Sequence, residues 1–522
     1  KLLEDKILPE YLIRVKWSKI TTKIKNVKII ENIYLGKASD NLIIFEVNYT
    51  DSSSETYQLL LSFLNMANSK NIIDYLPPEV LITILNTGTD EEILYDGFYN
   101  NEVRNTLLEF ILNKKILRGK YGSIHLHLES KIKKQVLANK SPSSILLKSE
   151  NNNILINFNN FLFLKIYRKL ETGINSDVEM INFLNQRKVN FVPTLNGNIK
   201  YIGKKDFFIL AIMENIVPNE GDVWNYTINS INHFLQRLAS STNNKSPEIN
   251  FSEMEVNINN ILPEIHELFG TFYLEMINKM GQRTGEIHIA LATNSLESGF
   301  APEPFSKLYQ RSIYQSVRSL SKKTFINLRK NLEKRPENIK FYAESLFGIE
   351  SKLQSLLKET LNKKFETIKI RIHGNFNLKQ VLTTGKDFIV TGFEGDSTYA
   401  LSERKLKRSS LKDVSSMLYS IYRAIYTTFH QYNPISKEDE NRANNYLNIL
   451  YYYTAGIFLS SYLNTIEETK LKPGKKDEYQ LLIKIFLVEE ILLNLDNALA
   501  TNNNDEIMVS LNTLEFVKNY YL

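Results

Sequence analysis

The stretch that decides the fold is residues 371–382, RIHGNFNLKQVL, followed after one residue by residues 384–396, TGKDFIVTGFEGD. Two short apolar runs, Ile368–Ile372 and Phe388–Thr391, flank polar and glycine-containing turns, which is the pattern of a β-hairpin with its loops. From Trp224 onward, most of the remaining chain has the apolar spacing of helices. We therefore expect a hairpin region, 368–396, embedded in a large helical domain.

The chain before residue 219 has a mixed pattern. Strands are expected at Val27–Ile33, Leu42–Tyr49, Ser144–Leu147, Ile154–Phe158, Phe161–Tyr167 and Phe207–Ile212. Asp177–Gln186 has apolar residues at a helical period and follows Ser176, which is a candidate N-cap. This order predicts an α+β, two-lobed fold preceded by an α/β piece, with divisions at 1–135, 136–218 and 219–522.

The composition is that of a folded protein with more than one domain. The 522 residues are 43% hydrophobic and 23% charged, and the formal net charge is only +6. Lysines alternate with acids along most of the chain, so we expect no nucleic-acid partner. Cysteine is absent, which fits a cytoplasmic protein, and no apolar run is long enough to span a membrane.

The segment 371–396 resembles the catalytic hairpin of the maltokinases, relatives of the aminoglycoside phosphotransferases. The family pattern is His-Gly-Asp-Tyr-His-Leu-Gly-Gln-Val, then a strand, then Asp-Phe-Glu-Gly. Further resemblances follow in the family's order, at Arg14–Trp17, Leu162–Glu171, Asn175–Glu179, Val217–Trp224, Phe300–Phe305 and Leu406–Val414. Together these strings cover nearly the whole chain.

The resemblance implies a two-lobed, protein-kinase-like fold of the aminoglycoside phosphotransferase type, with an N-terminal cap subdomain at 1–135. It implies ATP and Mg²⁺ as cofactors and maltose, or a related sugar, as substrate. Family members transfer the terminal phosphate of ATP to maltose, and many are fused to, or assemble with, a trehalose synthase. A trehalose synthase or glycoside hydrolase is therefore the expected partner or fused domain, and the missing initiator methionine is compatible with such a fusion.

In the expected N-lobe, the resemblance assigns nucleotide binding to four residues. Lys165 lies on the strand that carries the nucleotide lysine, and Glu179 lies on the next helix as the carboxylate that holds it. Met213 and Glu214 end the strand before the hinge and are expected to contact the cofactor. A surface ion pair is the alternative interpretation of Lys165 and Glu179.

In the expected C-lobe, two catalytic positions depart from the family pattern. Asn375 stands at the position of the catalytic base, two residues after His373, and a neutral amide cannot take up a proton. Gly392 stands at the position of the main magnesium-binding aspartate, and glycine supplies no ligand. Gln380 retains a metal-contacting position, and His373 is expected to brace the loop.

These departures predict a maltokinase-like pseudokinase that acts as a binding or scaffolding module in trehalose or glucan metabolism. The turn at residues 150–153 supports this hypothesis, because Ile154 and Leu155 replace two phosphate-binding hydroxyls of the family. One alternative is an active ATP-dependent maltokinase with an altered catalytic site. The other is a purely structural assembly subunit.

Overall fold

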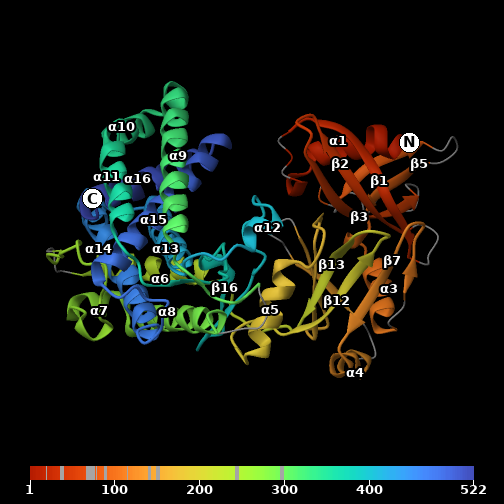
Figure 1. Cartoon of the computed structure of the whole chain (residues 1–522), viewed down its shortest axis with the longest axis horizontal. Helices are drawn as coiled ribbons and strands as arrows, with labels where there is room; N and C mark the ends of the chain where they lie inside the picture. The colour runs from red at the N-terminus through yellow and green to blue at the C-terminus, as the bar shows by residue number, and fades with distance from the viewer. Residues whose placement is uncertain are drawn as a thin grey trace. The chain divides into compact units, whose positions relative to one another are not determined.

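The chain forms two compact units in the computed structural model (Figure 1). Unit 1 comprises residues 1–185 and 193–217, and unit 2 comprises residues 186–192 and 218–522. The structure describes all residues except 19, 21, 36–39, 66–76, 78, 87–90, 114–115, 139–142, 148–152, 242–245, 294–298 and 435, and except the side chains of 16, 86 and 135–138.

The first part of unit 1 is a curled antiparallel sheet. Its strands are β1 (Ile24–Tyr34), β2 (Asn41–Tyr49), β3 (Ser54–Asn65), β5 (Glu91–Asp96) and β4 (Leu81–Asn86), in that spatial order, and the short β11 (Lys169–Leu170) also pairs with β3. The N-terminal helical segment, η1 (Leu3–Ile7), α1 (Leu8–Arg14) and η2 (Lys16–Ser18), packs on one face of this sheet. Leu8, Tyr11 and Leu12 of α1 join Phe45 and Tyr57 of the sheet in one buried apolar cluster.

The second part of unit 1 is a seven-stranded sheet. Its spatial order is β6 (Leu117–Arg118), β7 (Ser123–Leu128), β12 (Leu195–Ile202), β13 (Phe207–Glu214), β10 (Leu162–Ile166), β9 (Ile154–Phe158) and β8 (Ser144–Leu147). The helices α3 (Asn101–Leu112), α4 (Ser130–Ala138) and α5 (Ser176–Gln186) belong to the same unit. The strand β7 lies in the segment that the sequence assigns to the cap, yet it pairs with β12 of the expected N-lobe.

The strand and helix predictions in unit 1 can now be compared with the observed bounds. The strands β8 and β9 have the predicted ends, β10 is one residue shorter at each end, and β13 continues to Glu214. The N-cap prediction is wrong by one residue. The helix α5 begins at Ser176, and the Asn175 side chain accepts a hydrogen bond from the backbone N–H of Asp177 at 2.8 Å, as an N-cap does.

Unit 2 is mostly helical. Its helices are α6 (Val223–Ser240), α7 (Pro263–Phe269), α8 (Thr271–Leu291), α9 (Lys307–Asn331), α10 (Glu337–Ser345), α11 (Ile349–Asn362), α12 (Leu401–Arg404), α13 (Leu411–Gln431), α14 (Lys437–Thr465), α15 (Lys476–Ala500) and α16 (Asn504–Tyr520). The buried helix α13 is central, since it contacts α6, α14, α15 and α16. Four short strands, β14 (Glu303–Pro304), β15 (Ile368–Lys369), β16 (Val381–Thr383) and β17 (Phe388–Val390), form two small antiparallel pairs.

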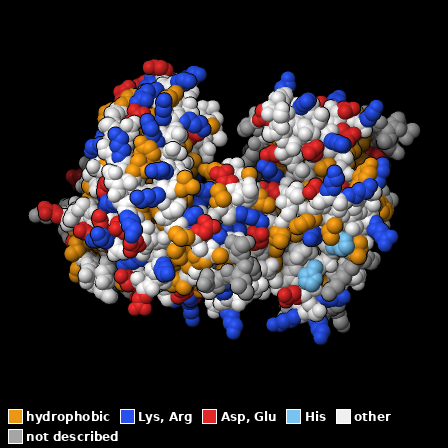
Figure 2. Space-filling view, viewed as in Figure 1, with side chains coloured by type: hydrophobic (Ala, Val, Ile, Leu, Met, Phe, Trp, Pro, Cys, Tyr) orange, Lys and Arg blue, Asp and Glu red, His pale blue; other side chains and the backbone are white. Residues whose placement is uncertain are grey.

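Basic and acidic side chains are intermingled on the visible surface of each unit (Figure 2). Among the described residues, no helix is both long enough and apolar enough to cross a membrane.

A buried carboxylate joins the two sheets of unit 1. Glu31 of β1 is 1% exposed and accepts hydrogen bonds from the backbone N–H groups of Lys120 and Tyr121, both at 2.8 Å, and of Gly122 at 2.7 Å. The hydroxyl of Tyr201 on β12 donates to the same carboxylate at 3.0 Å. Gly119 makes this approach possible, because a Cβ atom built there would overlap the Glu31 carboxylate. With the backbone N–H of Asn32, which donates at 3.0 Å, five donors surround this buried carboxylate and make Glu31 a structural anchor.

We predict that Glu31→Gln destabilises unit 1 by ~2 kcal/mol, because an amide NH₂ group would face backbone donors. Burial raises the pKa of Glu31, but the backbone and Tyr201 hydrogen bonds outweigh burial and lower it below its ordinary value of 4.5. A lowered native pKa stabilises the fold fully above the unfolded-state pKa, and this contribution is lost progressively as the pH falls from there through the native pKa. Urea unfolding at pH 7 and pH 3.5 should therefore show a smaller difference between the two proteins at the acidic pH. An unchanged difference would contradict the role of the carboxylate charge.

Candidate functional site

The segment 371–396 forms a hairpin with ordered loops in unit 2. The strands β16 and β17 are antiparallel, with Val381 opposite Val390 and Thr383 opposite Phe388. Their turn is closed by Thr384, whose backbone N–H donates to the carbonyl of Asp387 at 2.9 Å. Val381 and the apolar side chains of β17 are buried and Leu382 is half-buried, whereas Lys386 in the polar turn is exposed.

A buried aspartate holds the loop before the hairpin in place. Asp413, in the first turn of α13, accepts hydrogen bonds from the backbone N–H groups of His373 at 2.7 Å and Gly374 at 2.9 Å. The Nε2 atom of His288, on α8, lies 3.2 Å from the same carboxylate. Burial raises the pKa of Asp413, but the hydrogen bonds and nearby imidazoles outweigh burial and lower it. Asp413 is therefore an ionised anchor between two helices and the loop.

His373 is a bracing residue in this arrangement. It is only 3% exposed, and its Nε2 atom lies 2.8 Å from the backbone carbonyl oxygen of Thr391, on the far side of the hairpin. Its ring lies 4.9 Å from the ring of Phe393 and 5.4 Å from that of Phe376, measured between centroids. These contacts connect the loop before β16 to the loop after β17.

Asn375, at the position of the base, belongs to a local network of amides. The Nδ2 atom of Asn377 donates to both the backbone oxygen and the side-chain oxygen of Asn375, each at 3.1 Å. The Asn377 side chain also caps the short helix η7 (Leu378–Gln380) by accepting from the backbone N–H of Lys379 at 3.0 Å. Both side chains are neutral at physiological pH, so neither can act as a general base.

The two predicted metal positions lie side by side. Gly392 has a φ of +77°, and a Cβ atom built on it would overlap the side-chain oxygen of Gln380. The Gln380 amide therefore fills the space next to Gly392 that a side chain at position 392 would enter. Glutamine and glycine together offer one neutral oxygen, whereas magnesium sites rely on carboxylates.

Nearby acids do not complete a magnesium site. Asp387 forms a bidentate ion pair with Arg283, whose Nε donates at 2.9 Å. The Asp396 carboxylate accepts from the backbone N–H of Thr398 at 2.9 Å and from its hydroxyl at 2.8 Å. Within the described parts of the chain, no group of three or more His, Asp or Glu side chains converges in a way that could hold a metal ion. The residues of the hairpin thus do not fit the Mg²⁺ that the family pattern implies.

In unit 1, the lysine that the sequence predicts to bind nucleotide is paired with a buried carboxylate. Lys165 on β10 forms an ion pair with Asp177 at 2.7 Å, and the predicted pairing of Lys165 with Glu179, two residues later, stays a prediction. The hydroxyl of Tyr167 donates to the same carboxylate at 3.1 Å. Asp177 is 1% exposed in the first turn of α5, whereas Glu179 is partly accessible to solvent. The carboxylate of this ion pair is therefore buried, unlike the carboxylate of a surface ion pair.

The other predicted nucleotide residues lie at the end of β13. Met213 is fully buried and pairs with Leu164 of β10, and Glu214, 8% exposed, pairs with Phe163. Their nucleotide contacts remain a prediction. Residues 150–152 of the predicted phosphate turn lie outside the described residues.

Three residues that make buried polar contacts near the predicted site were not predicted from the sequence. Asp177 and Asp413 lie in strings that resemble the family, but spacing alone assigned neither a role. His288, within a long helix 125 residues before Asp413, had no signal at all.

Comparison with solved structures shows what this arrangement resembles. The chain is similar to a glucosamine kinase in complex with glucosamine, ADP and inorganic phosphate, with a TM-score of 0.59 and 12% identity over 98% of this chain and 97% of that one. Crystal form B of a glucosamine kinase matches with a TM-score of 0.60 and 11% identity, over 98% and 97% of the two chains. The chain has a kinase-like fold. No protein-family model matches it.

At these identities the likeness concerns the fold alone. It extends over both units of the kinase-like chain, including the α/β piece that precedes the lobes. The predicted α+β, two-lobed architecture with a mostly helical C-terminal part is therefore confirmed. The hairpin is the segment of this fold in which the chemistry must be judged residue by residue.

We predict that Asp413→Asn destabilises unit 2 by ~3 kcal/mol, because the variant places an NH₂ group against two backbone donors in a buried site. Chemical denaturation monitored by circular dichroism measures the change. Asp505→Asn is the matched control, since Asp505 is exposed in the first turn of α16 and should change stability by less than ~1 kcal/mol. Equal losses in both variants would refute the anchoring role.

We also predict that Gly392→Ala costs about 1–2 kcal/mol, because an L-residue is strained at a φ of +77°. Gly348→Ala separates backbone strain from the overlap of a new Cβ atom with Gln380, since Gly348 has a φ of +103° with open space around it. Gly474→Ala, with open space and no positive φ, should be neutral or slightly stabilising. The expected order of stability losses is 392, then 348, then 474, and a neutral Gly392→Ala would be inconsistent with the described loop.

Proposed function

We propose that this protein is a catalytically silent relative of the sugar kinases that uses the kinase-like fold as a binding or scaffolding module. The observation that carries the proposal is the pair Asn375 and Gly392, in which neither the base position nor the metal position has an ionisable side chain. Gln380 next to Gly392 supplies only a neutral oxygen.

The size of the expected losses in rate supports a catalytically inactive protein. Loss of general-base help costs about 10²- to 10⁴-fold in rate. The missing metal ligand weighs more, because phosphoryl transfer depends on neutralising the charge that develops on the transferred group. Asp387 is paired with Arg283, so its use as a substitute ligand would break an existing ion pair, and Asp396 would have to give up its hydrogen bonds from Thr398.

The proposed ligands follow from the fold and from the retained residues. The glucosamine kinase above binds glucosamine, ADP and inorganic phosphate. For this chain we propose a nucleotide held through Lys165, Met213 and Glu214, and a sugar such as maltose or an amino sugar. A trehalose synthase or glycoside hydrolase partner, and a cytoplasmic location, are part of the same proposal.

A working kinase of altered mechanism is the second candidate, and a specific observation favours it. Lys165 keeps a buried carboxylate partner, Asp177, as a phosphate-binding lysine requires. A loose transition state needs little help from a base, so Asn375 alone does not exclude transfer. The two candidates differ in whether ADP is released.

The deciding experiment measures nucleotide binding and turnover in the same sample. Calorimetry with ATP and Mg²⁺, then with maltose or glucosamine, should show nucleotide binding, and a coupled assay should show no ADP release above the spontaneous rate. Lys165→Ala should weaken nucleotide binding at least about tenfold by removing the phosphate-binding cation. Steady ADP release that depends on sugar and disappears in Lys165→Ala would overturn the proposal and establish the working kinase.

A further inference from the structure

A cavity of about 570 Å³ lies among the C-terminal helices of unit 2, at a distance from the hairpin. It is enclosed by residues of α10, α13, α14 and α16, and no residue of the segment 371–396 lines it. Asp413, the hairpin anchor, begins the same helix α13 whose later turns form one cavity wall. With a rise of 1.5 Å per residue, Asp413 and Tyr426 are about 20 Å apart along that helix. The volume is within the range of small-molecule sites.

The wall formed by α13 is a row of rings. Tyr422, Tyr426 and His430 follow one another at four-residue intervals, one per helical turn. The ring centroids of Tyr422 and Tyr426 are 6.4 Å apart, and those of Tyr426 and His430 are 6.0 Å apart. Both pairs are inclined by only 12°, so the three rings run nearly parallel. Tyr422 is 3% exposed, so the accessible part of this row is provided by Tyr426 and His430.

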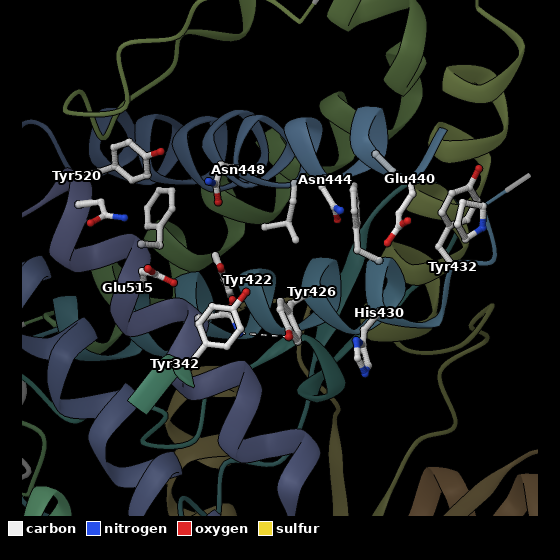
Figure 3. Close-up of a pocket in the computed structure, with 17 residues that line it drawn as sticks. Tyr342, Tyr422, Tyr426, His430, Tyr432, Glu440, Asn444, Asn448, Glu515 and Tyr520 are labelled. Atoms are coloured by element: carbon white, nitrogen blue, oxygen red, sulfur yellow. Dashed lines mark hydrogen bonds between the residues drawn. The ribbon is translucent and has the colours of Figure 1, made fainter. Parts of the chain in front are cut away.

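The facing wall is polar. Glu440, Asn444 and Asn448 of α14 also recur at four-residue intervals, and Figure 3 shows them entering the cavity from the helix opposite the rings. On the third side, α16 contributes Asn512, Glu515 and Asn519. The cavity is therefore lined by aromatic rings, amides and two carboxylates. Further rings come from Tyr342 of α10, from Tyr432 and from Phe516 and Tyr520 of α16.

Some of these polar side chains make no hydrogen bond to another described residue of the protein. The Asn512 amide donates to the hydroxyl of Tyr426 at 3.2 Å and to the carbonyl of Met508 at 2.9 Å, which orients that ring. Glu440 pairs with Lys437. The side-chain amides of Asn444 and Asn448, by contrast, make no hydrogen bond to another described residue. Their donors and acceptors face the cavity.

The chemistry of the lining indicates a hydroxyl-rich ligand. Each amide offers donors and an acceptor together, which matches hydroxyl groups, whereas an anion needs donors and a cation needs acceptors. The cavity lining contains no Lys or Arg, so a phosphate or a carboxylate ligand is disfavoured. The parallel rings provide the apolar surface on which the C–H faces of a pyranose pack.

We propose that this cavity is a binding site for a neutral saccharide, separate from the hairpin. It does not depend on whether the hairpin transfers phosphate, since the two sites share no residue. The rings of α13 bind the apolar faces of the sugar, and Asn444 and Asn448 bind its hydroxyls.

The test uses the full chain with glucose, maltose and maltotriose as probes, measured by saturation-transfer NMR and calorimetry. Tyr426→Ala and Asn448→Ala should each weaken binding of at least one probe about tenfold or more, because each removes a direct contact. Asn448 makes no internal hydrogen bond, so its variant should fold normally, and circular dichroism checks this. Tyr314→Ala on α9 is the control for loss of a half-buried tyrosine outside the cavity.

Asn375→Ala distinguishes the cavity from the hairpin. Retained binding in Asn375→Ala and lost binding in both cavity variants supports the proposal. Binding that is lost in Asn375→Ala and retained in the cavity variants overturns it. Absence of binding of all three probes at millimolar concentration also overturns it, as does displacement of the sugars by choline, which would identify a cation site.

Discussion

The hairpin depends on one buried charge. Asp413 cannot be ionised in the interior of unit 2 without donors, and its donors are the backbone N–H groups of His373 and Gly374 and the imidazole of His288. Satisfying that charge fixes the loop before β16 against α13 and α8. His373 then extends the constraint across the hairpin through Thr391 and the neighbouring aromatic rings. The loop conformation is thus built from backbone bonds and packing.

This construction explains how the loop conformation accommodates neutral residues at positions 375 and 392. Neither Asn375 nor Gly392 contributes a charge to the network around Asp413, so neutral residues at these positions leave the scaffold satisfied. At a φ of +77° glycine is the least strained residue, and its missing side chain leaves room for Gln380. Stability and chemistry are therefore carried by different residues of one short segment.

Most regular elements could be predicted from periodicity, because their side chains alternate or recur at a helical period. The strands β8, β9 and β10 and the helices of unit 2 followed this rule. The strand β12 was missed, since Gly197 and two asparagines lower its intrinsic β preference, and pairing with β7 and β13 on both sides overrides that preference. The same pairing joins β7 to the second sheet, although the sequence places it in the cap.

The sequence by itself determined the mixed α and β character of the first part and the helical character of the second, the kinase-like fold, and the absence of ionisable groups at positions 375 and 392, because these depend on residue identity and local spacing. Only the tertiary structure showed that Asp177 is a buried carboxylate partner of Lys165, since a pairing across twelve residues depends on where the first turn of α5 points. The contact between His288 and Asp413 could not be predicted from the sequence either. So was the saccharide cavity, whose walls come from four helices spread over more than 170 residues and become a site only when those helices pack together.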